Sequence, residues 1–293
     1  MHRAISFLAA ILMMTLTVTS ACIAAPTENI GFELEPSKRG ADQVQLSLRS
    51  GSDRRNNNMS SSFRIADLAG LDRNRLASSG PVAFALIREA GRLDCGGEAR
   101  AARAEGACRF TADTGFSNLL AARGMARLTT EEAFGLTIVG ANRGLLDALH
   151  RAGYPMPAVQ DYIAMTAVGV TPRYIAELTS AGYRPDRSNR LIEFAAIGVT
   201  PQYLGTLARA GYANLPQEEV VQLAALDIDP EFIRGFERIG FARLPVSRLV
   251  ELKALGITPA YVQEVRRSSR GEQSIQKIVE LKAIGFEPAA GDR

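Results

Sequence analysis

Few residues in this chain could carry covalent or acid–base chemistry. Its 293 residues include only two histidines, His2 and His150. A Ser-His-Asp triad or a histidine-based metal site would have only His150 to draw on beyond the N-terminal segment, and His150 falls at a variable position expected on a solvated helix face. Asp227 and Asp229 leave a carboxylate-based enzyme as an alternative, because paired carboxylates can perform acid–base catalysis. We nevertheless predict a protein that is not an enzyme, with no catalytic residue, no metal and no cofactor.

His150 and the two aspartates belong to a part of the chain with a 29-residue period. Four units begin with the segments GVTPRY, GVTPQY, DIDPEF and GITPAY, whose prolines are Pro172, Pro201, Pro230 and Pro259. A fixed period of this length indicates stacked supersecondary units. Arrays of this kind usually bind other molecules, so the period favours a binding function over a catalytic one.

Each unit is expected to contain two short helices. Thr171 is a helix N-cap and Pro172 a first helical residue, while Gly182 marks the end of that helix. By the same rule Asp229 is an alternative N-cap, whereas Asp227 has no evident structural role. About six units fit over residues 111–284, and they predict a right-handed α-solenoid of helix-turn-helix repeats within 114–290.

The N-terminus has the pattern of an export signal. Arg3 precedes the apolar run of residues 4–18, and the small residues that follow suit cleavage by signal peptidase. Residues 1–25 are therefore a predicted signal peptide. Lipidation at Cys22 is an alternative, because Ser-Ala-Cys resembles the end of a lipobox, and an uncleaved membrane anchor is another. We expect an exported protein in the periplasm or on the outer surface, either free or membrane-anchored.

The region between signal and repeats predicts a small antiparallel β domain. Residues 26–42 are polar and turn-rich, as in a linker, and residues 50–62 have the composition of a flexible polar loop. Alternating or β-branched runs at 44–48, 81–89, 92–98 and 106–111 predict strands within a domain at 43–113. The last two strands would place Cys95 beside Cys108, so an exported chain is expected to form a disulfide there. Two buried thiols are the alternative. The first helix of the solenoid is expected to cap this domain.

One position of the repeat is consistently basic. It holds Ser180 in one unit, and in the others the four arginines Arg151, Arg209, Arg238 and Arg267. These arginines are candidates for binding an acidic partner or an anionic polymer. The alternative is that they are solvated side chains which complement the dipole at a helix C-terminus. A ladder of aromatic residues, Tyr183, Tyr212 and Phe241, could bind carbohydrate or peptide, but its mixture of Tyr and Phe favours packing in the core.

Units of the form GVTPxYIxxLxxAGY, together with the β module AGRLDCGGEAR…EGACRFTADTGFSNLLAARG, resemble the extracellular part of bacterial sensor zinc peptidases of the BlaR type. The resemblance covers roughly residues 44–288. It transfers no catalytic residue, because the His-Glu-x-x-His motif of those peptidases is absent. It implies an exported sensing appendage that is detached from any enzyme.

The function predicted from these observations is an exported, non-enzymatic interaction or sensing scaffold of the bacterial cell envelope. Its helical repeats would bind a protein or peptide partner, and membrane contact would come only through the N-terminal signal or a lipid. Nucleic-acid binding is an alternative, since a helix-hairpin-helix array has a similar outline. The net charge of +3 and the near balance of basic and acidic residues from residue 140 onwards argue against it.

Overall fold

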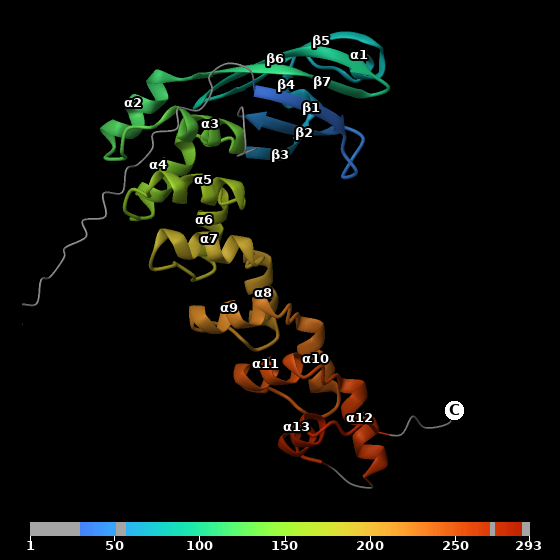
Figure 1. Cartoon of the computed structure of the whole chain (residues 1–293). Coiled ribbons are helices and arrows are strands. Elements are labelled where there is room, and N and C mark those ends of the chain that lie inside the picture. Colours follow the sequence, from blue (N-terminus) through green and yellow to red (C-terminus); the bar gives the residue numbers. More distant parts are fainter. Residues whose placement is uncertain (1–29, 51–56, 270–272, 289–293) are drawn as a thin grey trace, which may run out of the picture.

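The computed structural model describes residues 30–50, 57–269 and 273–288, so the predicted signal segment 1–25, with Cys22, lies outside the described residues. The fold is α+β: an N-terminal antiparallel sheet of seven strands is followed by twelve helices. In Figure 1 the helices lead away from the sheet in one elongated row. None of the helices described is both long and apolar enough to cross a bilayer.

The seven strands form a single sheet. They are β1 (Ile30–Pro36), β2 (Gln43–Ser50), β3 (Asn57–Arg64), β4 (Leu68–Ala69), β5 (Gly80–Arg88), β6 (Gly91–Arg100) and β7 (Arg103–Ala112), and their order is β3-β2-β1-β7-β6-β5-β4. A 3-10 turn, η1 (Ile65–Asp67), precedes β4, and a short helix, α1 (Arg73–Ala77), precedes β5. Alternate residues of the strands are buried, as Phe32 and Leu34 in β1 illustrate, so one face of the sheet forms the core.

The interior strand β1 lies inside the range 26–42 that composition assigned to a linker, and that prediction was wrong for Ile30–Pro36. Its alternation of Ile30, Phe32 and Leu34 with polar residues is a strand signal, and all three side chains are buried. The pattern was missed because it is short and lies between residues typical of turns. The domain therefore begins before residue 43, and β1 joins β2 to β7, which would otherwise be separate parts of the sheet.

The predicted polar loop at 50–62 is also wrong for its second half, because β3 starts at Asn57. Its sequence NNMSSSFR has no apolar alternation, and within residues 58–64 only Phe63 is buried. The strand forms because its backbone pairs with β2 along its whole length. Side-chain bonds reinforce this pairing on the outer face, where the Gln45 side chain donates to Ser60 Oγ at 2.6 Å and accepts from Ser62 Oγ at 2.7 Å.

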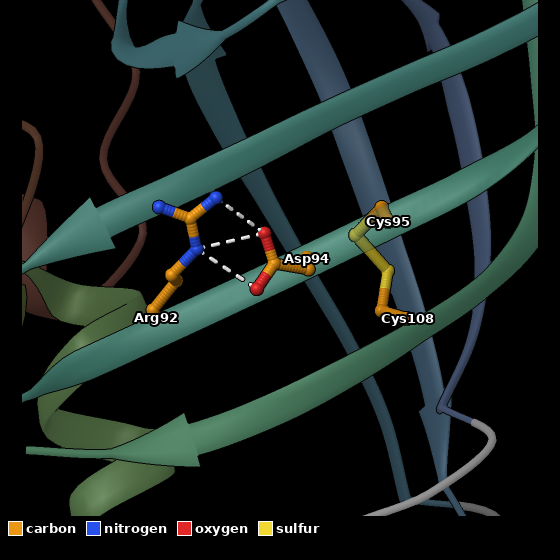
Figure 2. The surroundings of a disulfide bond; sticks show 4 residues. All are labelled: Arg92, Asp94, Cys95 and Cys108. Carbon is orange, nitrogen blue, oxygen red and sulfur yellow. Dashed lines mark hydrogen bonds and ion pairs between the residues drawn. A yellow bond between two sulfur atoms is a disulfide. The ribbon is translucent and has the colours of Figure 1, made fainter.

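The predicted strands β2, β5, β6 and β7 are present, and the structure contains the predicted disulfide. Cys95 on β6 lies directly opposite Cys108 on β7, with their Cα atoms 4.0 Å apart and both side chains buried. Figure 2 shows this bond beside the ion pair of Arg92 and Asp94, which lies on the outer face of β6. The guanidinium of Arg92 lowers the pKa of the Asp94 carboxyl through their hydrogen bonds. The disulfide therefore links the neighbouring strands β6 and β7 from the core side.

Helix α3 (Thr130–Val139) joins the sheet to the helices. It packs on β6 and β7, and its Ala133 and Ile138 are part of the sheet core. The first helix, α2 (Thr114–Ala122), instead places Phe116 and Leu120 in the core of the helical region. The prediction that the first helix caps the sheet was therefore wrong. The second helix takes this role: a capping box at Thr129 starts it, and its Ala133 and Ile138 are buried among residues of the sheet.

The remaining helices continue in pairs. They are α4 (Arg143–Arg151), α5 (Val159–Ala167), α6 (Pro172–Ser180), α7 (Ser188–Ala196), α8 (Pro201–Arg209), α9 (Gln217–Ala225), α10 (Pro230–Arg238), α11 (Val246–Ala254), α12 (Pro259–Ser268) and α13 (Ile275–Ala283). With α2 and α3 they make six pairs, in agreement with the six predicted units. Even-numbered helices stack on even-numbered ones (α4 on α6, α6 on α8) and odd-numbered on odd-numbered (α3 on α5, α5 on α7, α9 on α11).

The ends of the helices follow the sequence signals. The side chains of Thr171, Thr200 and Thr258 each accept a hydrogen bond from a backbone N–H in the first turn, and Asp229 does the same in α10. Asp227, which had no evident role, occupies a turn where the other units have glycine. Its φ of +50° is left-handed, a conformation that aspartate tolerates better than most residues.

Tyrosine hydroxyls connect three of the units to the backbone that follows them. Tyr174, Tyr203 and Tyr261, which occupy the same repeat position, donate to the carbonyls of Val199, Ile228 and Phe286 at 2.7, 2.9 and 2.7 Å. The second tyrosine position behaves similarly, since the Tyr183 hydroxyl accepts from Leu215 N–H and the Tyr212 hydroxyl donates to the Leu244 carbonyl. Tyr183 and Tyr212 are both 8% exposed, so this ladder is part of the core, as the mixture of Tyr and Phe indicated.

Candidate functional site

The four candidate arginines lie at equivalent places in the helical array. Arg151, Arg209 and Arg238 are the last residues of α4, α8 and α10, and Arg267 is the penultimate residue of α12. All four are exposed. Because each unit contributes its first helix in the same orientation, these side chains lie along one long edge of the array. We call the C-terminal ends of the even-numbered helices, with the turns that follow them, the arginine edge.

Ion pairs within the chain engage only some of these arginines. Arg238 is 2.7 Å from Glu231 on its own helix, and Arg267 is 3.9 Å from Glu264. Hydrogen bonds from Arg238 and Arg234 lower the pKa of the Glu231 carboxyl. No ion pair is formed by Arg151 or Arg209 within the described ranges. The paired side chains stay largely exposed, and exposed pairs contribute only about 0–1 kcal/mol, so a partner can open them at little cost.

The edge holds more arginines than the repeat pattern alone revealed. The segments 121–128, 150–157, 179–186, 208–215, 237–244 and 266–269 contain nine arginines and only two acidic residues, Asp186 and Glu237. The nine are Arg123, Arg127, Arg151, Arg184, Arg209, Arg238, Arg243, Arg266 and Arg267. This local excess of seven positive charges exceeds the net charge of +3 of the whole chain, so the basic character is concentrated here.

Two arginines that sequence reasoning missed are held over aromatic rings. The Arg184 guanidinium lies 5.7 Å from the ring centroid of Tyr154, which belongs to the preceding unit. Arg266 lies 4.5 Å from the ring centroid of Phe241, and its Nη1 donates to the Ile239 carbonyl at 2.8 Å. Such contacts fix the guanidinium before any partner arrives. The only sequence signal for these two contacts is the aromatic residue in the preceding unit.

The residues that could perform catalysis or bind a metal do not form a second site. His150 is exposed at the end of α4, next to Arg151. Asp229 uses a carboxylate oxygen to accept the Phe232 N–H at 2.7 Å, and the Asp227 carbonyl accepts from Lys253 Nζ at 2.8 Å. A surface hollow of about 590 Å³ lies beside Asp229. Its lining includes acidic side chains, basic side chains and Phe232. Across the part of the chain that the structure describes, no cluster of His, Cys, Asp and Glu could hold a metal ion.

Comparisons with protein-family models, with curated proteins and with solved structures found no match to this chain.

Proposed function

We propose that this protein is an exported, non-enzymatic interaction scaffold of the bacterial cell envelope. Its helical repeats, stacked as a right-handed solenoid, bind an acidic protein or peptide partner through the arginine edge. The observation that carries the proposal is the localisation of nine arginines, against two acidic residues, on one edge of a chain whose net charge is only +3. Arginine is well suited to this role, because its planar guanidinium binds carboxylates through two parallel hydrogen bonds.

The architecture supports a binding role. Consecutive units are tied by apolar cores that run along the array and by tyrosine hydroxyls bonded to the next unit's backbone. Repeated units of this kind hold surface side chains at regular intervals on a firm support. The backbone that carries these cations is therefore already ordered, so binding costs the entropy of the arginine side chains but not that of the array.

Export is supported by the buried disulfide of Cys95 and Cys108, because disulfides persist mainly in oxidising compartments. In this proposal the N-terminal segment directs the chain out of the cytoplasm, and either signal cleavage or lipidation of Cys22 follows. Mass spectrometry of the mature protein recovered from cell envelopes distinguishes these outcomes. A cytoplasmic protein with free thiols at both cysteines would refute export.

The test of the partner is a crosslinking pull-down from cell envelopes with three forms of the full chain. The first is the unmodified protein, and the second carries Arg→Ala at the four edge positions Arg151, Arg209, Arg238 and Arg267. The third is a control that removes four exposed arginines away from the edge, Arg75, Arg100, Arg109 and Arg173. Both variants lose the same charge. We expect the partner to be retained by the control and lost from the edge variant. Retention by both variants would refute the arginine edge as the binding surface.

A further inference from the structure

We infer that the arginine edge recognises an extended acidic polypeptide whose carboxylates recur at every third residue. This inference rests on the proposed function and specifies the partner of the same surface. The three consecutive units that end in Arg209, Arg238 and Arg267 supply the central contacts, and the exposed ends of these side chains point to a linear ligand that follows the array.

The spacing of the units sets the period of the ligand. Packed helices lie about 8–10 Å apart, so an arginine at the same position of successive helices recurs at about that distance. The contact between α10 and α12 shows this close packing, since a Cβ on Gly235 would lie 2.7 Å from Cγ of Pro259. A chain in the extended polyproline II conformation advances about 3.1 Å per residue with three residues per turn, so side chains at every third residue lie on one face about 9 Å apart. A helix advances only about 1.5 Å per residue. Carboxylates at every third residue of a helix would therefore recur at about 4.5 Å and would not match the spacing of the arginines.

The irregular unit refines the pattern. Ser180 replaces the arginine at the end of α6, so no carboxylate is required opposite that unit. Arg184 follows in the next turn, but its guanidinium lies back against the preceding unit, close to Gly153 and over the Tyr154 ring. It therefore adds a second cation next to Arg151. The expected ligand has one carboxylate opposite Arg151 and Arg184, a neutral stretch opposite α6, and then three carboxylates at intervals of three residues.

Two carboxylates that pair with edge arginines from outside the edge favour such a spaced ligand over a dense polyanion. Glu231 and Glu264 lie one or two turns before the arginines that they pair with, and they remain about half exposed. A polymer with charge at every position would meet these carboxylates as well as the arginines. A peptide with well-separated carboxylates can replace them at the guanidinium and leave neutral residues opposite the glutamates.

The experiment measures fluorescence anisotropy of labelled peptides with the full-length protein. Three peptides share one composition of glutamate, serine and glycine, and their glutamates stand at every third residue, at every second residue, or in one block. We expect the third-residue peptide to bind about tenfold more tightly than the others, which corresponds to about 1.4 kcal/mol. Arg209→Ala and Arg238→Ala should each weaken its binding about fivefold or more, whereas the control Arg173→Ala, at the start of α6, should leave it unchanged.

Equal binding of the three peptides, still weakened by the edge substitutions, would overturn the spacing and leave the acidic-partner function intact. Stronger binding to vesicles of anionic lipid than to any peptide would overturn the inference in favour of a membrane surface. If no acidic peptide binds, the inference fails. The pull-down with the four-arginine variant then decides separately whether the proposed function survives, because a partner lost from that variant still requires the edge.

Discussion

Replacing Phe232 with tyrosine should stabilise the helical array. In the units that carry tyrosine at this position, the hydroxyl donates to a carbonyl of the following unit, as Tyr203 does to Ile228 at 2.9 Å. Phe232 occupies the same place and is partly buried. Because phenylalanine has no hydroxyl, the corresponding carbonyl of Ile257 receives no such bond. A hydroxyl at the end of the Phe232 ring would supply the missing donor at that repeat.

The magnitude follows from the energy of a buried hydrogen bond. A net gain of about 0.5–1.5 kcal/mol is typical for one such bond, and leaving a buried carbonyl unpaired costs about 1–3 kcal/mol. Phe232→Tyr should therefore raise the free energy of unfolding by about 1 kcal/mol. The reverse change, Tyr203→Phe, should lower it by about 1–3 kcal/mol, since no backbone N–H among the described residues bonds to the Ile228 carbonyl.

Urea unfolding followed by circular dichroism measures both changes. The dependence on urea must be compared as well as the midpoint, because a repeat array can lose its cooperativity. Tyr154→Phe is the matched control, since the Tyr154 hydroxyl forms no hydrogen bond within the structure as described, and its removal should change stability by less than about 0.5 kcal/mol. The reasoning is refuted if Phe232→Tyr is neutral while Tyr203→Phe costs no more than this control.

Four further predictions concern other parts of the molecule. Replacing Cys95 and Cys108 together with alanine should lower stability by about 2–3 kcal/mol, as judged from urea midpoints under non-reducing conditions. Changing Ala101 to Asn and Ala102 to Gly should raise the thermal midpoint through a gain of about 1 kcal/mol, because both alanines have left-handed φ values, 49° and 64°, in the β6–β7 turn. Leu252→Ala, at a site with no exposed surface, should cost about 2–5 kcal/mol in urea unfolding. Burial raises the pKa of all seven tyrosines above the ordinary value of 10.0. Their contribution to the free energy of unfolding should therefore be constant below that pH and decline above it, as an alkaline unfolding titration can show.

Controls separate these effects from general damage. Reducing agent should destabilise the unmodified protein and leave the double cysteine variant unchanged. Ile284→Ala, at a position 80% exposed, is the counterpart of Leu252→Ala and should be nearly neutral. Tyr203→Phe should show a smaller alkaline loss than the unmodified chain. A thermal midpoint that falls in the Asn-Gly variant, or an alkaline loss equal in the Tyr203 variant, would contradict the corresponding prediction.

The helical part was predictable because its signals are local and recur. Thr171 with Pro172 starts a helix, Gly182 ends it, and the same signals return in later units, so each unit supports the assignment of the others. Asp227 shows the limit of this reasoning. Its replacement of glycine looked like chemistry, but the turn requires only a residue that tolerates a left-handed φ.

Strands β1 and β3 could not be found in the same way, because their formation depends on distant partners. β1 is short and lies between turn residues, and it is stabilised by pairing with β7 near the other end of the domain. β3 is polar apart from Met59 and Phe63 and owes its structure to backbone pairing with β2. Among the candidate binding residues, the regular arginines were evident from the period. Arg184 and Arg266 were not, because their positions are not repeated and their aromatic partners lie in the preceding unit.

The place of β1 between β2 and β7 has a consequence for the order of folding. Each helical unit contacts mainly the next one, so the contacts of the array join residues that are close in the sequence. The sheet is complete only when Ile30 meets Cys108 across most of the domain, and such distant pairings slow folding. In refolding experiments, helical circular dichroism should therefore recover before protection of the β1 amides from hydrogen exchange. If the chain is exported unfolded, as proposed, it would then assemble the arginine edge first and complete the sheet afterwards.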